Sequence, residues 1–199
     1  MRPLFTQRSS PTLSAWILAT ALCALMAGGA RANEQPPLKV NKGDVPPAEL
    51  GLSRDGKLIE TTQFGGKVLV VTFWATWCGP CRAEIAYLEA LQRKVSKDIL
   101  QVVAINIEER AVFREAVRKM SDYKILVAND SYKRYAGAFG VNGIPHMLII
   151  GKDGKVAAVH RGYSEAFIPT LVEEIAAELY AGVGSPEKAN EAPVARTPG

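Results

Sequence analysis

The sequence predicts an α/β fold built around a mixed β-sheet with helices on both faces. Val68–Trp74 is a nearly continuous apolar run, as expected of a strand that is covered on both sides. Leu100–Ile107 has the pattern of a second buried strand. Helical patterns alternate with the predicted strands, so the expected order along the chain is βαβαβαββα.

Each predicted element is bounded by turn residues or by a change in hydrophobic spacing. A short edge strand at Lys57–Glu60 follows the turn Arg54-Asp55-Gly56, and a helix at Cys81–Val95 follows the first buried strand. The other expected elements are helices at Ala111–Met120, Tyr132–Phe139 and Ala166–Tyr180, and strands at Ile125–Ala128, Met147–Ile150 and Lys155–His160. Lys152-Asp153-Gly154 joins the last two strands as a hairpin turn.

The first residues are typical of an export signal rather than of a folded domain. Arg2 and Arg8 precede an apolar run at 13–27, and Ala30-Arg31-Ala32 forms an A-x-A cleavage site. We therefore expect residues 1–32 to be a signal peptide and the protein to be periplasmic. An uncleaved N-terminal anchor is the alternative, although the run is shorter than the roughly 20 residues that span a bilayer.

The remaining chain is expected to hold one domain at 43–183, between a linker at 33–42 and a disordered tail at 184–199. The signal contains three arginines and no acid, so its removal lowers the net charge from +4 to +1. Because no block of Lys and Arg remains, we expect no nucleic-acid partner. We expect a monomer.

Cys78-Gly79-Pro80-Cys81 is the strongest functional signal. After the signal leaves with Cys23, these two cysteines are the only ones in the chain. They lie where a buried strand meets a helix, whose free N–H groups and positive dipole end stabilise a thiolate. We expect Cys78 to attack a substrate disulfide and Cys81 to resolve the mixed disulfide.

The residues beside the two cysteines are expected to position substrate. Trp77 lies on one side of Cys78, and Gly79 and Pro80 form the turn on the other. A structural zinc site is the competing interpretation of a Cys-x-x-Cys pair. Only two histidines are available as further ligands and their spacing matches no zinc module, so we expect no metal.

Glu84 is a candidate proton acceptor because it lies three residues after Cys81 on the same helix face. Partial burial would raise its pKa toward neutral pH. An exposed acid paired with a surface cation is the alternative. Thr72, on the preceding strand, cannot carry a proton in this way and is expected to be a neutral packing residue.

Gly143-Ile144-Pro145 opens an apolar strand, which makes Pro145 a candidate cis-proline. The backbone of Ile144 would then be available to pair with a substrate segment. His146 follows directly and is expected near Cys78, where it would favour the thiolate or bind a soft metal. The alternatives are a trans-proline and a hydrogen-bonded strand histidine.

The segment Phe73–Glu84, FWATWCGPCRAE, resembles the active-site segment of the TlpA/ResA-like thioredoxin family. Gly66-Lys67-Val68, Tyr135–Pro145 and Asp153-Gly154 fit the same pattern, and the resemblance covers roughly 43–181. It implies a thioredoxin fold with a central βα insert, a cis-Pro145 and Glu84 as the active-site acid. His146 departs from the family, in which threonine is usual at that position.

The resemblance also implies a periplasmic thiol-disulfide oxidoreductase that acts as a reductase. Its expected clients are apocytochrome c or the copper-site cysteines of an oxidase, and its electron donor is a membrane thiol transporter of the DsbD/CcdA type. Apart from the redox-active disulfide of Cys78 and Cys81, no cofactor is implied. The alternative is a Cu(I)-binding module that uses both cysteines and His146.

Overall fold

The structure, a computed structural model, describes residues 39–182 of the 199-residue chain. One mixed sheet runs through this part of the chain, with seven strands in the order β2-β1-β5-β4-β3-β6-β7. The strands are β1 Glu49–Ser53, β2 Leu58–Glu60, β3 Val68–Trp74, β4 Leu100–Asn106, β5 Leu126–Asn129, β6 His146–Ile150 and β7 Val156–Arg161. The helices are α2 Gly79–Lys94, α3 Arg110–Arg118, α4 Arg134–Ala138 and α5 Ile168–Tyr180, with 3-10 turns η1 Thr61–Phe64 and η2 Glu165–Phe167.

Strands β3 and β4 form the centre of the sheet, and every residue in them is buried. The two strands are parallel, from Val68 opposite Leu100 to Trp74 opposite Asn106. Strand β6 pairs antiparallel with the other edge of β3. Because β3 has a strand on each side and helices above and below, its apolar sequence is buried as predicted.

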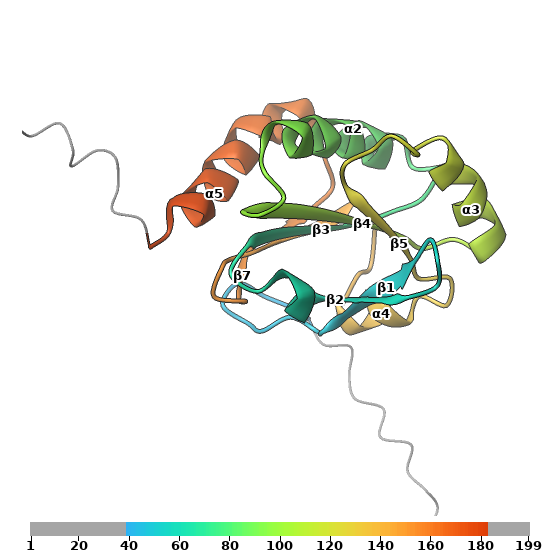
Figure 1. Cartoon of the computed structure of the whole chain (residues 1–199), viewed down its shortest axis with the longest axis horizontal. Coiled ribbons are helices and arrows are strands. Elements are labelled where there is room, and N and C mark those ends of the chain that lie inside the picture. The colour runs from blue at the N-terminus through green and yellow to red at the C-terminus, as the bar shows by residue number, and fades with distance from the viewer. Residues whose placement is uncertain (1–38, 183–199) are drawn as a thin grey trace, which may run out of the picture. The chain divides into compact units, whose positions relative to one another are not determined.

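Helices cover both faces of the sheet (Figure 1). Helices α2 and α5 lie on one face, and α4 lies on the other. On the first face, Ile85 of α2 and Leu171 of α5 pack in a cluster that also contains Val70, Cys78 and Cys81. A second cluster, on the opposite face, contains Phe73, Leu148 and Ala136 of α4. Since Phe73 and Trp74 belong to different clusters, the alternation of side chains along β3 decides which residues share a face with the cysteines.

Strand β1 was not expected from the sequence. It pairs antiparallel with β2 and β5, with an irregular register between Glu49 and Gly51. Gly51 has φ +143°, and a Cβ there would lie 3.1 Å from the carbonyl oxygen of Asn129. A glycine and a bulge within five residues hide the alternation by which a strand is recognised.

Several helices begin or end at other residues than the sequence predicted. The active-site helix begins at Gly79 rather than Cys81, and α4 covers only Arg134–Ala138. In the helix predicted at Ala166–Tyr180, apolar spacing predicts that Val172 faces inward, but this residue of α5 is 44% exposed. Between β4 and β6 the chain forms α3, β5 and α4, which is where the central insert was expected.

Val40, in the predicted linker, is 5% exposed and packs in the second cluster. The predicted signal peptide at 1–32, residues 33–38 of the linker and the tail at 184–199 lie outside the described residues. Within 39–182, no helix has the length and apolarity needed to cross a membrane.

Candidate active site

Cys78 and Cys81 are joined by a disulfide with an S–S length of 2.03 Å and a Cα–Cα distance of 5.3 Å. Cys78 is the N-cap of α2, and its sulfur accepts a hydrogen bond of 3.2 Å from the backbone N–H of Cys81. Cys78 is 5% exposed and Cys81 is fully buried, whereas Trp77 beside them is 70% exposed. The first cysteine is therefore the one that a partner reaches, although most of its surface is covered.

The start of α2 favours negative charge on Cys78. Pro80 lies in the first turn of the helix, where its missing N–H removes no hydrogen bond. The free N–H group of Cys81 in that turn donates to the sulfur of the N-cap residue. After reduction, this N–H group and the positive end of the helix dipole stabilise a thiolate at Cys78.

Glu84 is buried, with 1% of its surface exposed, and within residues 39–182 it forms no ion pair with a surface cation. Its Oε1 accepts a hydrogen bond from Thr72, and its Oε2 has no partner among the described residues. Burial raises the pKa of Glu84 from 4.5 to about 7, and the Thr72 hydrogen bond offsets part of this rise. Thr72 is therefore more than the neutral packing residue that was expected, because it holds the carboxyl group and tunes it.

The peptide bond between Ile144 and Pro145 is cis. Ile144 packs against the cluster that contains both cysteines. The carbonyl oxygen of Pro145 accepts a hydrogen bond of 2.8 Å from the backbone N–H of Gly162, which follows β7. This bond ties the proline loop to the segment between β7 and α5.

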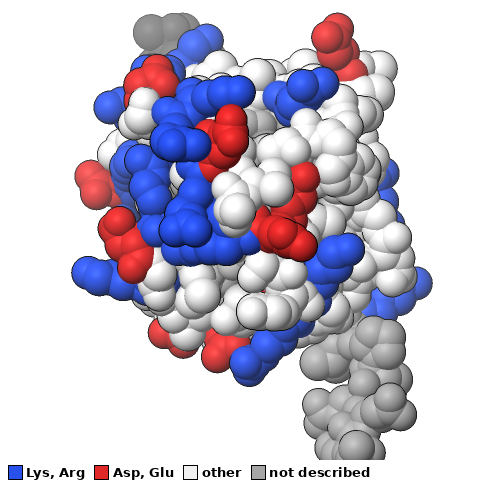
Figure 2. All heavy atoms as spheres, turned by 90° about the vertical axis from the view of Figure 1, so that its right-hand side faces the viewer, with Lys and Arg blue, Asp and Glu red and all other residues white. Residues whose placement is uncertain are grey.

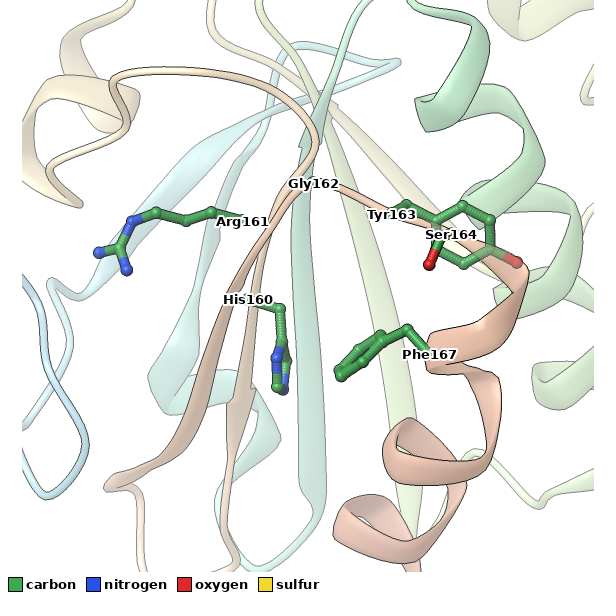
Figure 3. Close-up of a pocket in the computed structure, with 6 residues that line it drawn as sticks. All are labelled: His160, Arg161, Gly162, Tyr163, Ser164 and Phe167. Atoms are coloured by element: carbon green, nitrogen blue, oxygen red, sulfur yellow. The ribbon is translucent and has the colours of Figure 1, made fainter.

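A hollow of about 330 Å³ lies at that segment, lined by His160, Arg161, Gly162, Tyr163, Ser164 and Phe167. Figure 3 shows the rings of His160 and Phe167 facing each other, with Arg161 directed to the other side of the strand. Burial raises the pKa of Tyr163, and nearby Glu165 and Glu84 raise it further. Tyr163, which lines the hollow, is therefore within range of the charge of Glu84. No local motif predicts the hollow, because the pairing of β6 with β7 and the hydrogen bond to Pro145 together bring Gly162 to the site.

His146 does not join the two sulfurs. It belongs to β6, with Leu148 and Phe73 on the face of the second cluster, while Met147 faces the cluster of the cysteines. Its ring meets Phe73 edge-on at 6.3 Å, and both ring nitrogens lack a hydrogen-bond partner within the described part of the chain. Burial and the charge of Arg161 lower the pKa of His146 from 6.5 to about 4. The prediction that His146 lies near Cys78 is therefore wrong. Adjacent residues of a strand point to opposite faces of the sheet, and His146 points away from the face that carries the cysteines.

Between residues 39 and 182, no group of three or more His, Cys, Asp or Glu side chains is arranged to hold a metal ion. The Cu(I) hypothesis needed His146 as the third ligand beside the two sulfurs. With that ring on the other face of the sheet, the hypothesis loses the geometry on which it depended.

A family model described as Redoxin matches residues 41–175. The chain belongs to the Redoxin family. Thiol-disulfide oxidoreductase ResA from Bacillus cereus is 33% identical to this redoxin over 102 residues, which is 51% of this chain and 59% of that relative. The match thus spans less than two thirds of the relative's length.

Solved structures confirm the thioredoxin fold of this redoxin. A Chlorobium tepidum protein assigned as thiol:disulfide interchange protein DsbE has a TM-score of 0.63 and 30% identity, over 71% of this chain and 99% of that chain. A second structure from Chlorobium tepidum, described as a thiol:disulfide interchange protein of the thioredoxin family, has a TM-score of 0.58 and 25% identity, over 70% and 98% of the two chains. The resemblance to TlpA/ResA-like thioredoxins is likewise confirmed.

Proposed function

We propose that this redoxin is a periplasmic thiol-disulfide oxidoreductase that reduces protein disulfides through Cys78 and Cys81. The observation that carries the proposal is a closed cysteine pair at the N-terminus of α2, beside a buried carboxyl group whose pKa is about 7. A nucleophile that is stabilised as a thiolate and a group that exchanges protons near neutral pH are the two requirements of the reaction.

The reaction begins with the reduced protein. The Cys78 thiolate attacks one sulfur of a client disulfide, the client S–S bond breaks, and the released client thiolate takes up a proton. Cys81 then loses its proton and attacks the sulfur of Cys78. The mixed disulfide breaks, the second client thiolate leaves and is protonated, and the Cys78–Cys81 disulfide seen in the structure forms. Two electrons and two protons pass to the client in total.

We assign Glu84 as the group that accepts the proton of Cys81. Both residues are buried on α2, three positions apart, so they lie on the same face of the helix. A carboxyl group whose pKa is about 7 is partly ionised at neutral pH and can accept a proton. Because water has little access to Cys81, an acceptor within the protein speeds the resolving step.

Client segments are expected to bind across Trp77, Gly79, Pro80, Ile144 and Pro145. The exposed indole of Trp77 offers apolar contact beside Cys78, and the backbone of Ile144 offers strand-like pairing. We place His146 outside this surface because it is 1% exposed. Following the family resemblance, we propose as clients apocytochrome c or oxidase copper-site cysteines, a DsbD/CcdA-type thiol transporter as electron donor, and a monomeric state.

The direction of the reaction follows from the dipeptide between the cysteines. A Gly-Pro pair resembles thioredoxin, whose potential is about −270 mV, rather than oxidising DsbA at about −120 mV. We expect a redox titration of the full chain against glutathione to give the potential of a reducing protein. A potential above about −180 mV would assign the opposite direction.

The decisive experiment is a Cys81→Ala trap made in the full chain and expressed in a bacterial periplasm. Without its resolving thiol, Cys78 should hold client proteins as mixed disulfides that mass spectrometry identifies and that dithiothreitol releases. The matched control is Cys78→Ala, which should trap nothing. Equal yields from both variants would contradict the assignment of Cys78 as the attacking thiol.

A further inference from the structure

A second hollow, of about 280 Å³, shares no lining residue with the hollow of Figure 3. The residues that line it and matter here are Trp74, Thr76, Arg82, Ile85, Lys119 and Met120. They come from the end of β3, from the first two turns of α2 and from the end of α3 and the turn after it. We call this hollow the α2–α3 pocket.

The pocket is next to the reacting sulfurs. Thr76 comes two residues before Cys78, and Arg82 directly follows Cys81. Trp74 and Ile85, which form part of its wall, pack in the same cluster as both cysteines. A client segment whose cysteine is bonded to Cys78 therefore passes close to the mouth of the pocket.

The walls of the pocket are apolar, and its charged groups are cations. Ile85, Met120 and Trp74 are all at most 9% exposed. Arg82 and Lys119 both line the pocket, and neither forms an ion pair within the described residues. Two unpaired cations beside apolar walls suit a group that combines an apolar body with a negative charge.

Nearby acids are already engaged with other groups. The carboxylate of Glu108 accepts hydrogen bonds from the backbone N–H and the hydroxyl of Thr76, at 2.6 and 2.9 Å. Asp122 pairs with Arg93 at 3.2 Å, and Glu115 lies 4.0 Å from Arg118. None of these three carboxylates is among the residues that line the pocket.

The surrounding surface extends the positive charge. Figure 2 shows Lys and Arg side chains gathered on the face of the molecule that carries α3. Arg54, Arg114 and Arg118 line a neighbouring hollow on this helix. Arg114 and Arg118 lie four residues apart on one face of α3, and the fold brings Arg54 to the same face. Such a field attracts an acidic partner before contact is made.

We propose that the α2–α3 pocket binds a client segment in which an acidic and an apolar side chain lie next to the client's cysteine. The proposal rests on the proposed function and adds the chemistry of the client to it. The volume is just below the range of about 300–1,000 Å³ that is usual for small-molecule sites, which favours one or two side chains over a separate ligand.

The test compares disulfide-bonded peptides that differ only beside the cysteine: Glu-Leu, Gln-Leu or Lys-Leu. The reduced full-length protein should react about tenfold faster with the Glu-Leu peptide than with the Lys-Leu peptide at low salt. In Lys119→Glu the ratio of these rates should fall to about one or below. Lys155→Glu, an exposed position on the turn before β7, is the matched control and should keep the wild-type ratio.

Each variant is judged by its own ratio of the Glu-Leu rate to the Lys-Leu rate. A mutation that changes the reactivity of Cys78 toward all peptides therefore does not affect the comparison. Equal rates with the Glu-Leu and Lys-Leu peptides in the wild type would overturn the inference, and so would an unchanged ratio in Lys119→Glu. In both cases the peptides are still reduced, and the proposed function stands. Failure to reduce any peptide, or the small neutral hydroxyethyl disulfide, would instead contradict the proposed function and the inference with it.

Discussion

The hydroxyl group of Thr72 donates a hydrogen bond of 2.5 Å to Oε1 of Glu84, and both residues are buried. This bond connects the central strand β3 to the active-site helix α2. Burial favours the protonated carboxyl group, whereas the hydrogen bond favours the carboxylate, and burial has the larger effect. The balance leaves Glu84 with a pKa of about 7, at which it can both take up and release a proton under neutral conditions.

Thr72→Val keeps the shape of the side chain and removes the donor. The pKa of Glu84 should rise further, because the hydrogen bond from Thr72 lowers it and burial then acts unopposed. We expect the pH midpoint of the resolving step to move upward by about one pH unit, the usual weight of a hydrogen bond to a charged group. Stopped-flow release of a client thiol measures that midpoint, and Thr72→Ser, which retains the hydroxyl, should leave it in place.

Glu84→Gln should make the oxidised protein more stable than the wild type at neutral pH. The unfolded carboxyl group ionises near 4.5 and the folded one near 7, so between these values only the folded state holds the proton. Wild-type stability due to Glu84 is therefore present below pH 4.5 and lost as pH rises through 7. Guanidinium unfolding at pH 4.5 and 8 should show the advantage of the variant growing by about 3 kcal/mol. A constant difference would contradict the raised pKa.

His146→Leu should have the opposite dependence on pH. The pKa of His146 is about 4 in the folded protein and near 6.5 in the unfolded chain, so between these values only the unfolded state takes up the proton. Wild-type stability is then lost as pH falls from 6.5 to 4. Relative to the wild type, the leucine variant should gain about 3 kcal/mol over this interval. Unfolding midpoints at pH 7.5 and 4 test this, and parallel curves would refute it.

The effects of Glu84 and His146 act in overlapping pH ranges and have opposite signs. The unfolding free energy of the wild type should therefore change little between pH 4.5 and 6.5 as far as these two groups are concerned. Each variant removes one of the two contributions and exposes the other. Measuring both variants beside the wild type separates them.

Gly51→Ala should destabilise the protein by about 2 kcal/mol. A Cβ at this position would lie 3.1 Å from the carbonyl oxygen of Asn129 and 3.2 Å from Cβ of Ala128, and φ is +143°. The pairing of β1 with β5 must then loosen. Gly137→Ala is the matched control, because it lies in α4 with no neighbour within 4 Å of the added atom. Thermal unfolding should show a lower midpoint for the first variant and no loss for the second.

The predictions that held come from residues whose behaviour is set by their near neighbours in the chain. Val68–Trp74 is buried as a central strand because no exposed environment suits so apolar a run. Cys78 and Cys81 lie three residues apart at a helix start, close enough to form a disulfide in any fold that preserves the helix. The cis bond before Pro145 was likewise expected from Gly143-Ile144-Pro145.

The predictions that failed concern relations between distant segments. Strand β1 pairs with β2 nearby and with β5, which is more than 70 residues away, and a glycine at a bulge obscures its pattern. His146 was placed beside Cys78 by its position after Pro145, but its orientation is decided by its pairing with Phe73. The hollow beside Tyr163 and the α2–α3 pocket combine segments that no local spacing relates.

The amino-acid sequence alone determined the redox pair, the strand-to-helix transition that activates it and the α/β class of the fold, because apolar periodicity and helix-end electrostatics act over a few residues. Tertiary structure alone decided the burial of Glu84, the face on which His146 lies and the position of Arg54 beside the arginines of α3. These depend on desolvation and on side-chain direction, which are defined only once strands and helices from distant parts of the chain have packed together.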